Sequence, residues 1–304
     1  MNIISHKKIF LAISGLLVLV SLFVVAIQGI NYGIEFTGGS LMEVSYEDRP
    51  EREQLVTVIQ EAGFEDIQIQ PLGETGYVIK TGPLSEEQRK SLVSAVSLDE
   101  TLPTDEVVAS GATVERFNSI GPSIGKELRT KSLYALILVS LAIVLFVAYA
   151  FRKVSRPVSS WKYGIVAVIA LLHDIIIPVG ILVLLGTEID TLYVVGLLSI
   201  LGLSVNDTIV VFDRIRENLS YNTEHEIDEA FDVTVNEAIK QTVARSIVTS
   251  LTLVVVLVSL YLAGPVATQT LALVLLLGTI VGTYSSIFLA SPLLTVLVSK
   301  NNDE

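Results

Sequence analysis

The sequence predicts a mainly α-helical membrane protein, with six transmembrane helices and a small α+β extracytoplasmic domain between the first and second helices. Two observations predict this class. Of the 304 residues, 51% are hydrophobic and only 17% are charged. Six apolar stretches reach the roughly 20 residues that a helix needs to cross a bilayer, whereas the segment between the first two has the polar composition of a soluble domain.

The six spans are expected at residues 9–29, 133–151, 163–185, 191–212, 245–263 and 269–290. The first could instead be a cleaved signal peptide, because Lys7 and Lys8 precede its apolar core. We favour a retained anchor, since the apolar run over residues 9–27 exceeds the roughly 7 to 15 residues of a signal peptide and no A-x-A site follows it. The chain then divides into residues 1–29, with the first helix, residues 30–131, the outer domain, and residues 132–304, the five-helix region.

Basic residues in the short loops predict the orientation of the spans. The N-terminus carries Lys7 and Lys8, and residues 152–162 carry four bases and no acid: Arg152, Lys153, Arg156 and Lys162. Both segments are therefore expected in the cytoplasm, and the turn at residues 186–190, which has no base, is expected outside. Six spans then place both termini in the cytoplasm, and we expect a multi-pass protein of the cytoplasmic (inner) membrane.

Residues 30–131 are expected to form an acidic α+β domain, because they contain 18 acidic and 9 basic residues, a net charge of −9. Strands are predicted at residues 41–46, 66–72 and 76–82, where apolar or β-branched residues lie between turn signals. Helices are predicted at residues 50–63 and 85–97, the second opening with the capping-box residues Ser85 and Gln88. A strand around residues 111–120 is expected to close this β-α-β-β-α arrangement.

The segment at about residues 214–244 is expected to be a cytoplasmic amphipathic loop. Within residues 225–246, five apolar residues recur at helical intervals, with acids on the other face: Ile227, Ala230, Phe231, Val235 and Ile239. This pattern predicts a helix that lies along the membrane and continues into the fifth span. A solvated connector with core contacts only fits the same pattern equally well.

Several function classes are excluded by what the sequence lacks. It has no cysteine, which excludes disulfides, thiolate chemistry and cysteine-based metal sites. It has no P-loop, H-E-x-x-H or G-x-S-x-G element in a supporting context, so we expect no hydrolytic enzyme, no cofactor and no metal site. No basic patch with interleaved aromatic residues is present, so nucleic acid is not an expected partner.

Polar and ionisable residues interrupt three of the predicted spans. The third span holds His173 and Asp174 near its middle, the fourth holds Asn206 and Asp207 near its cytoplasmic end, and the fifth begins with Arg245. A charged group at mid-membrane costs at least ~2.5 to 3.5 kcal/mol on insertion scales, so such residues usually face the bundle interior and serve function. These five residues are the candidate ion-coupling site.

The chemistry that this set offers is reversible protonation. A changing distance between Asp207 and Arg245 would load and release a proton, and His173 could hold or relay one near neutral pH. Ser204 and Thr208 are expected to supply hydroxyl partners to Asp207. Sodium would suit the same oxygen atoms almost as well. The alternative is structural, with a static interhelical ion pair at Asp207 and a satisfied polar spot at His173.

Three segments resemble the SecD/SecF family. GIEFTGGS at residues 33–40 resembles the Gly-Gly signature after the first span, SIGPSIGKEL at 119–128 resembles the second signature, and NDTIVVFDRIREN at 206–218 is close to the SecF form of the fourth span. ALLHDIIIPVGIL at 170–182 and ARSIVTSLT at 244–252 also match. The signature residues are Gly33, Glu35, Gly38, Gly39, Gly121, Pro122 and Gly125. Glu35 stands where aspartate is commoner, which keeps the charge.

The resemblance implies the resistance-nodulation-division superfamily fold, in which this six-helix unit pairs with a similar unit of SecD. It also implies that the protein works beside the SecYEG channel and the accessory protein YajC, in contact with membrane lipid. There it would use the proton-motive force to move unfolded preprotein. Asp207 and Arg245 match by motif the residues linked to proton passage in the family. One alternative function is a proton-coupled exporter of small molecules or lipids, which predicts a second six-span repeat in the chain and larger outer domains. A second alternative is a non-transporting scaffold that stabilises a translocase, which predicts that neutralising Asp207 leaves activity intact.

Overall fold

The computed structural model describes residues 2–97, 112–151 and 159–299, and its contacts divide the chain into two units. The outer unit is Tyr32–Ser132, and the helical unit comprises the residues before and after it. Arg152, Lys153 and Arg156, which carry part of the orientation argument, lie outside the described residues. The orientation therefore stays a prediction.

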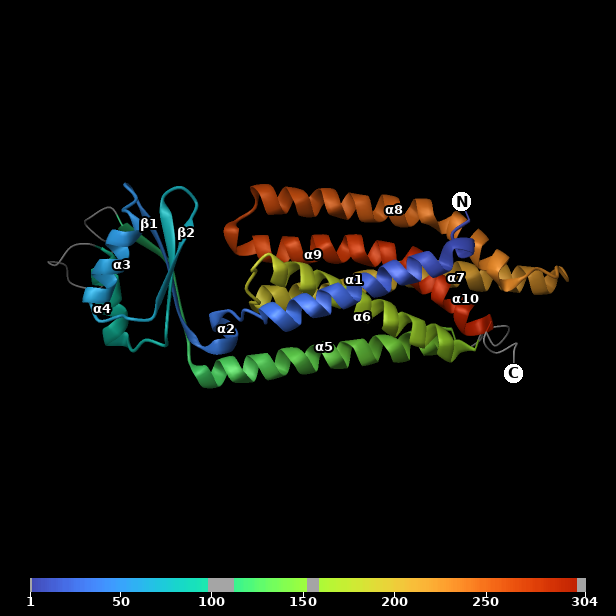
Figure 1. The fold of residues 1–304 in the computed structure, drawn as a ribbon, viewed down its shortest axis with the longest axis horizontal. Coiled ribbons are helices and arrows are strands. Elements are labelled where there is room, and N and C mark those ends of the chain that lie inside the picture. The colour runs from blue at the N-terminus through green and yellow to red at the C-terminus, as the bar shows by residue number, and fades with distance from the viewer. Residues whose placement is uncertain (1, 98–111, 152–158, 300–304) are drawn as a thin grey trace. The chain divides into compact units, whose positions relative to one another are not determined.

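The helical unit contains long helices in the order that the sequence predicts (Figure 1). Within the described residues, six helices are long and apolar enough to cross a membrane, which confirms the predicted fold class. They are α1 (Lys7–Gln28), α5 (Pro122–Ala150), α6 (Ser160–Leu184), α7 (Thr191–Glu224), α8 (Phe231–Ala263) and α9 (Val266–Ser285), the last continued by a π-helical turn (Ser286–Ala290) and α10 (Ser291–Ser299).

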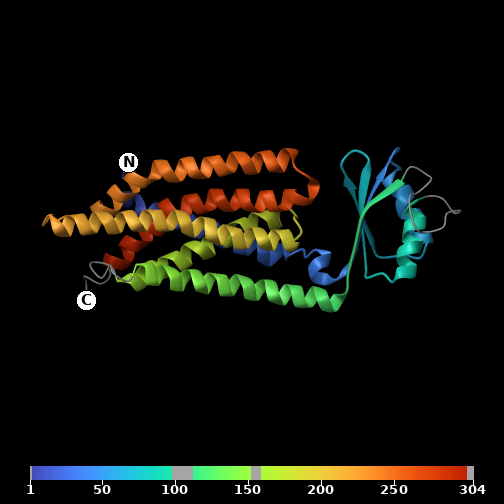
Figure 2. The same cartoon turned by 180° about the vertical axis from the view of Figure 1, so that it is seen from behind.

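Helices α7 and α8 are longer than the spans expected within them. Asp190 caps α7 by accepting a hydrogen bond from the backbone nitrogen of Tyr193 at 2.6 Å. Neither glycine nor proline occurs between Gly202 and Gly264, so no residue stops either helix early. The segment expected as a loop at residues 214–244 therefore consists mostly of two helix ends, joined by residues 225–230. Figure 2 shows α7 projecting beyond the neighbouring helices.

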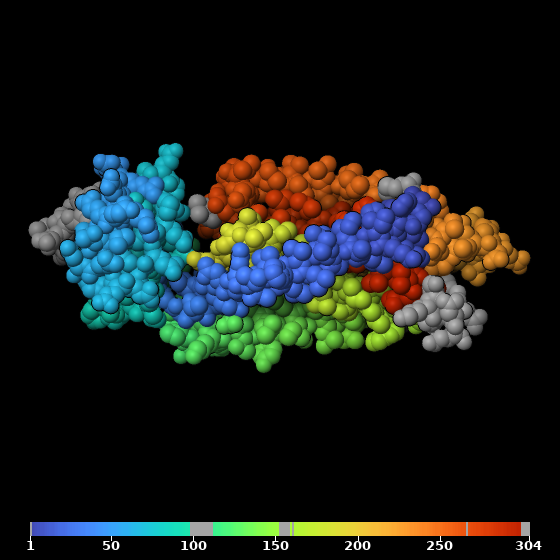
Figure 3. Space-filling view, in the orientation of Figure 1, coloured from blue at the N-terminus to red at the C-terminus, as the bar shows by residue number. Residues whose placement is uncertain are grey.

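Helices α6, α7 and α9 form the interior of the helical unit. About half of the apolar window of α6 is buried (56%), whereas only 6% is buried in α5 and 11% in α1 and in α8. Figure 3 shows α1 covering one face of this unit, with α5 and α8 on either side. Because a soluble protein rarely exposes so much apolar surface, the outward faces of α1, α5 and α8 suit lipid or partner helices.

The outer unit is a four-stranded antiparallel sheet with two helices. The strands are β1 (Gly39–Tyr46), β2 (Ile67–Leu72), β3 (Gly76–Thr81) and β4 (Ala112–Ile120), in the order β2-β3-β1-β4. The helices are α3 (Arg52–Glu61) and α4 (Glu86–Val96), and the capping box of Ser85 and Gln88 is present at the start of α4. The predicted order of strands and helices is thus confirmed.

The sheet and its two helices share one core. On the central strand β1, Met42 pairs with Ile79 of β3 and with Phe117 of β4, and alternate residues of the strand face the helices. Leu55 and Ile59 of α3 and Leu92 of α4 are buried in the same cluster. The alternation of apolar residues along β1 and the helical spacing of Leu55 and Ile59 therefore point to one interior, as their sequence patterns indicate.

Candidate functional site

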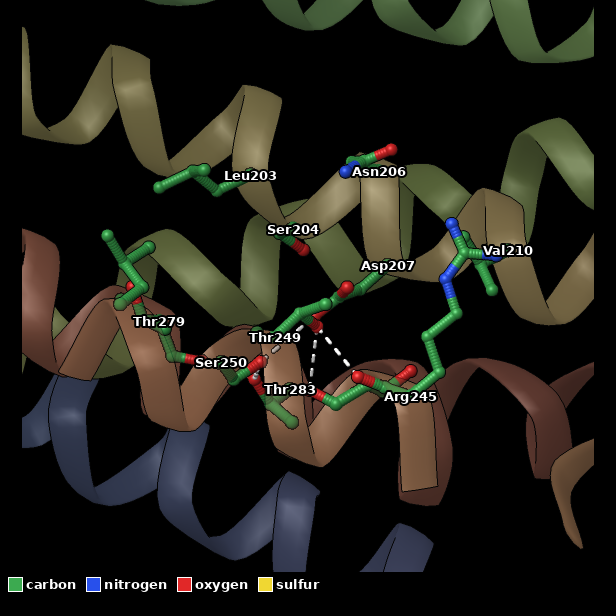
Figure 4. Close-up of a pocket in the computed structure, with 14 residues that line it drawn as sticks. Leu203, Ser204, Asn206, Asp207, Val210, Arg245, Thr249, Ser250, Thr279 and Thr283 are labelled. Carbon is green, nitrogen blue, oxygen red and sulfur yellow. Dashed lines mark hydrogen bonds between the residues drawn. The ribbon is translucent and has the colours of Figure 1, made fainter. Parts of the chain in front are cut away.

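A polar pocket opens between α7, α8 and α9 in the helical unit (Figure 4). Its volume is about 140 Å³, and polar side chains or glycines supply most of its lining. The lining residues that matter below are Ser204, Asn206 and Asp207 of α7, Arg245, Ser246, Thr249 and Ser250 of α8, and Gly282 and Thr283 of α9. A pocket that is this polar and roomy can hold water inside an otherwise apolar bundle.

Asp207 is half-buried at this pocket, and its partner comes from the neighbouring helix. The Ser250 hydroxyl donates to Asp207 Oδ2 at 3.4 Å, and the Thr283 hydroxyl can donate to Ser250 Oγ at 2.6 Å. These contacts connect the carboxylate of α7 through α8 to α9. The carboxylate therefore has hydroxyl support from residues that line the same pocket, an arrangement in which it can accept or release a proton.

Arg245 and Asn206 lie at the exposed rim of the same pocket. Arg245 is on α8, more than one turn before Ser250, and interacts electrostatically with Asp207. Across the described part of the chain, no ion pair joins the two side chains, and in Figure 4 the guanidinium does not point at the carboxylate. Asn206 is exposed, and its side chain points away from Asp207. Three of the five predicted site residues thus share one pocket, without a static ion pair between the acid and the base.

His173 and Asp174 form a separate, enclosed cluster. Asp174 is fully buried and His173 is 3% exposed. His173 Nδ1 lies 2.8 Å from Asp174 Oδ1, while the hydroxyls of Ser204 and Ser285 both donate to Asp174 Oδ2, the second at 2.7 Å. Helices α6, α7 and α9 therefore meet at one buried carboxylate.

The prediction that Ser204 and Thr208 supply hydroxyl partners to Asp207 is wrong. Ser204 donates to Asp174, and Thr208 pairs with Ser286 Oγ at 3.0 Å. Both residues are on the same helix as Asp207, but the helical rotation turns them toward α6 and α9. Ser250 takes their place, and its only sequence signal is a hydroxyl in the apolar run that follows Arg245.

Glycines allow α7 and α9 to approach closely. A Cβ on Gly278 would lie 2.2 Å from Ile200 Cδ1, and one on Gly196 would lie 2.7 Å from Val274 Cγ1. A Cβ on Gly282 would lie 3.2 Å from Ser204 Cβ. Gly202 of α7 makes no such contact, because a Cβ there would meet no described atom within 4 Å.

The two glycine signatures pack against each other within the outer unit. Residues Ile34–Thr37 form a single helical turn, α2, which ends at Gly38 with φ of 80°. A Cβ on Gly38 would lie 2.7 Å from Pro122 Cα, and one on Gly125 would lie 2.9 Å from the Gly38 backbone nitrogen. These contacts involve backbone atoms, so only glycine fits both positions. We call this contact between residues 36–38 and 121–125 the signature clasp.

Two aromatic contacts reinforce the signature clasp. Arg129, one turn after Gly125 on α5, lies 4.2 Å above the Tyr32 ring and donates to its hydroxyl at 3.1 Å. The Tyr32 ring packs edge-on against Phe36. Sequence reasoning marked the two signatures separately and missed both their contact and Arg129.

The six spans, the α+β unit after the first span and the acid-containing pocket define a multi-pass membrane protein with ionisable groups inside its helical bundle. Two family models match this chain. The model of the protein export membrane protein SecD/SecF, C-terminal, matches residues 104–300, and the SecD/SecF GG motif matches residues 23–48. The chain belongs to the SecD/SecF family, as its signatures indicate.

Curated relatives place the similarity on the SecF side of this family. Protein translocase subunit SecF from Desulfurispirillum indicum is 36% identical over 284 residues, which cover 93% of this chain and 87% of the relative. Protein translocase subunit SecF from Escherichia coli O157:H7 is 34% identical over 281 residues, covering 92% and 83%. The predicted resemblance to SecF is therefore confirmed over nearly the whole chain.

Solved structures agree with this assignment. SecDF from Thermus thermophilus, a translocon-associated membrane protein, matches with a TM-score of 0.83 and 33% identity over 99% of this chain. A second SecDF structure, in a super-membrane-facing form, matches with a TM-score of 0.69 and 31% identity. This chain covers 39% of each SecDF chain.

Proposed function

We propose that this protein is an ion-coupled subunit of the protein translocase, which works with SecD to promote preprotein movement through SecYEG. Family membership supports the translocase context, since the relatives named above are translocase subunits. The single observation that carries the coupling step is the position of Asp207, a half-buried carboxylate that lines a polar pocket between three apolar helices. Ionisable groups in such places usually serve transport.

Asp207 is the proposed carrier, and Arg245 is the proposed modulator of its charge. The two side chains line one pocket without a static ion pair, so the distance between them is free to change when α7 and α8 move relative to each other. Approach of the guanidinium favours the ionised carboxylate, and retreat favours the protonated one. Movement of the helices would thus be linked to proton uptake and release.

The proposed partners follow from how much of the SecDF chains this chain covers. This chain covers 39% of the SecDF chains, so a SecD unit is the proposed partner that completes the bundle. The apolar outer faces of α1, α5 and α8 would contact this unit or membrane lipid. We further propose SecYEG, unfolded preprotein and YajC as neighbours, and the inner membrane with both termini in the cytoplasm as the location.

Preprotein export with Asp207→Asn tests the proposal, in cells depleted of the endogenous protein. Asp213→Asn is the matched control, because this exposed acid of the same helix pairs only with Arg216, at 2.5 Å, in the described structure. We expect Asp207→Asn to abolish export at equal membrane level and equal co-purification with SecD, while Asp213→Asn supports it. Normal export with Asp207→Asn would favour the scaffold instead. Repeating the assay without sodium separates the two candidate ions.

A further inference from the structure

Ser204 belongs to both polar regions of the helical unit. Ser204 lines the pocket beside Asp207, and the Ser204 hydroxyl donates to Oδ2 of the buried Asp174. Ser285, the other hydroxyl donor to that oxygen, does not line the pocket. Within the described ranges, Ser204 is the one side chain that lines the pocket and hydrogen-bonds the enclosed acid.

The packing of α9 on α7 leaves space for the Ser204 side chain. Gly282 of α9 faces Ser204, and a Cβ on Gly282 would lie 3.2 Å from Ser204 Cβ and 3.5 Å from Ser204 Oγ. Alanine at this position would crowd Ser204 Cβ and would touch Oγ at ordinary contact distance. The Gly282 carbonyl accepts a hydrogen bond from Ser286 at 2.9 Å, and it lies 3.0 Å from Ser285 Oγ, whose single proton has the shorter contact with Asp174. The hydroxyl of Ser204 therefore remains directed at Asp174.

The enclosed acid is joined to a base with a free nitrogen. His173 Nδ1 contacts Asp174, whereas His173 Nε2 is buried without a hydrogen-bond partner among the described residues. The Tyr284 ring stacks on the imidazole, with 6.1 Å between the ring centroids. If Nδ1 carries the proton that faces Asp174, Nε2 presents a lone pair, so the His173–Asp174 pair has room for one more proton.

We propose that Ser204 is a relay residue, whose hydroxyl passes protons between the Asp207 pocket and the His173–Asp174 pair. In the inward step, pocket water that carries an excess proton gives it to Ser204 Oγ, and the original hydroxyl proton moves to Asp174 Oδ2. Water is left neutral, the serine is again a hydroxyl, and the carboxylate becomes a carboxylic acid. The outward step reverses this. The inference rests on the proposed ion coupling, to which it adds a second proton site.

Few charged groups compete with Ser204 for the buried acid. From α6 the facing group is His173, and from α7 the nearest acid is Asp207, on the pocket side of Ser204. The titratable group that α9 contributes is Tyr284, whose hydroxyl donates to the Phe10 carbonyl of α1 at 3.4 Å. Residues 9–28 of α1 and the π-helical turn Ser286–Ala290 contain no titratable side chain. Proton entry to Asp174 from the pocket therefore passes Ser204.

Infrared spectroscopy of the full chain in lipid vesicles tests the relay. The carbonyl band of protonated Asp174 is identified by its loss in Asp174→Asn, and its hydrogen–deuterium exchange is timed after transfer to D₂O. The two key variants are Ser204→Ala and Ser285→Ala, each of which removes one hydroxyl donor from the same oxygen. A structural role predicts equal effects from both.

We expect Ser204→Ala to slow exchange of the Asp174 proton by roughly tenfold or more, and Ser285→Ala to leave the rate near that of the parent. Equal rates in the two variants would overturn the relay, and so would the absence of an Asp174 carbonyl band at any pH. Asp207→Asn distinguishes this failure from that of the proposed function. If export survives Asp207→Asn, the coupling proposal fails, whereas the exchange rates of the serine variants report on the relay alone.

Discussion

Gly125 lies against Gly38, so that a Cβ on Gly125 would be 2.9 Å from the Gly38 backbone nitrogen and 3.1 Å from the Phe36 carbonyl carbon. The two glycines belong to different signatures, one before β1 and one after β4. Their contact holds the start of the central strand against the first turns of α5. The sheet and this helix end are thereby fixed to each other by backbone atoms.

Gly125→Ala is expected to destabilise the outer unit by about 1–3 kcal/mol. Alanine alone would favour the helix by roughly 0.5–1 kcal/mol, but its methyl meets backbone atoms that no side-chain rotation can move. The free energy of unfolding can be measured by urea titration of the full chain with pulse proteolysis of the outer unit. Gly121→Ala is the control, because a Cβ there meets no atom of the described residues within 4 Å. Equal stabilities of the two variants would show that the signature clasp is not tight.

Ser250→Ala is expected to reduce preprotein export, because it removes the hydroxyl that donates to Asp207 Oδ2 at 3.4 Å. The loss should be smaller than with Asp207→Asn, since the carboxylate itself remains and pocket water can replace one hydrogen bond. Ser259→Ala is the matched control on the same helix, because within the described residues the Ser259 hydroxyl donates only to the Val255 carbonyl. Export assays at equal expression decide the matter. If both variants export like the parent, Ser250 does not support the carrier.

Arg245→Gln is expected to lower preprotein export by about an order of magnitude, because it removes the charge that acts on Asp207 across the pocket. Arg245→Lys keeps the charge on a narrower side chain and should retain part of the activity. Arg216→Gln, in which an exposed ion pair with Asp213 is lost, serves as the control and should remain close to the parent. Full export with Arg245→Gln would show that Arg245 is not needed for coupling and that the proposed site consists of Asp207 without it.

The outer unit is expected to lose stability as the pH rises above about 10, the ordinary pKa of tyrosine. Burial, and secondly the charge of Tyr77, raise the pKa of Tyr46, whose hydroxyl donates to the Val96 carbonyl at 3.2 Å. Because the folded pKa exceeds the unfolded one, the stabilising contribution is complete below about pH 10 and is lost above it, as the unfolded chain releases the proton.

Tyr46→Phe provides the comparison for this pH dependence. It should cost about 1 kcal/mol near neutral pH, where the hydrogen bond to Val96 is missing. Above about pH 10 it should lose stability less steeply than the parent, because the buried hydroxyl is gone. Urea titrations with an alkali-tolerant protease, at about pH 8 and about pH 10.5, measure both effects. Parallel losses in the two proteins would mean that other groups cause the alkaline instability.

Much of this fold could be predicted from the sequence, because its signals are local. Hydropathy over about 20 residues locates a membrane helix whatever its neighbours are, and the alternation in β1 or the capping box at Ser85 acts within a few residues. The helix ends were less predictable. The continuation of α7 to Glu224 depends on the absence of a stop signal, since polar residues allow a helix as readily as a loop.

The sequence by itself determined which residues are candidates for ion coupling: ionisable groups in apolar spans are costly, so His173, Asp174, Asp207 and Arg245 stand out without any structure. Only the tertiary structure decided how they are grouped. Ser204 is three residues from Asp207, yet it hydrogen-bonds Asp174, while Ser250 reaches Asp207 from another helix. The physical reason is that a hydrogen bond needs contact at about 3 Å, and contacts between helices depend on their packing rather than on distance along the chain.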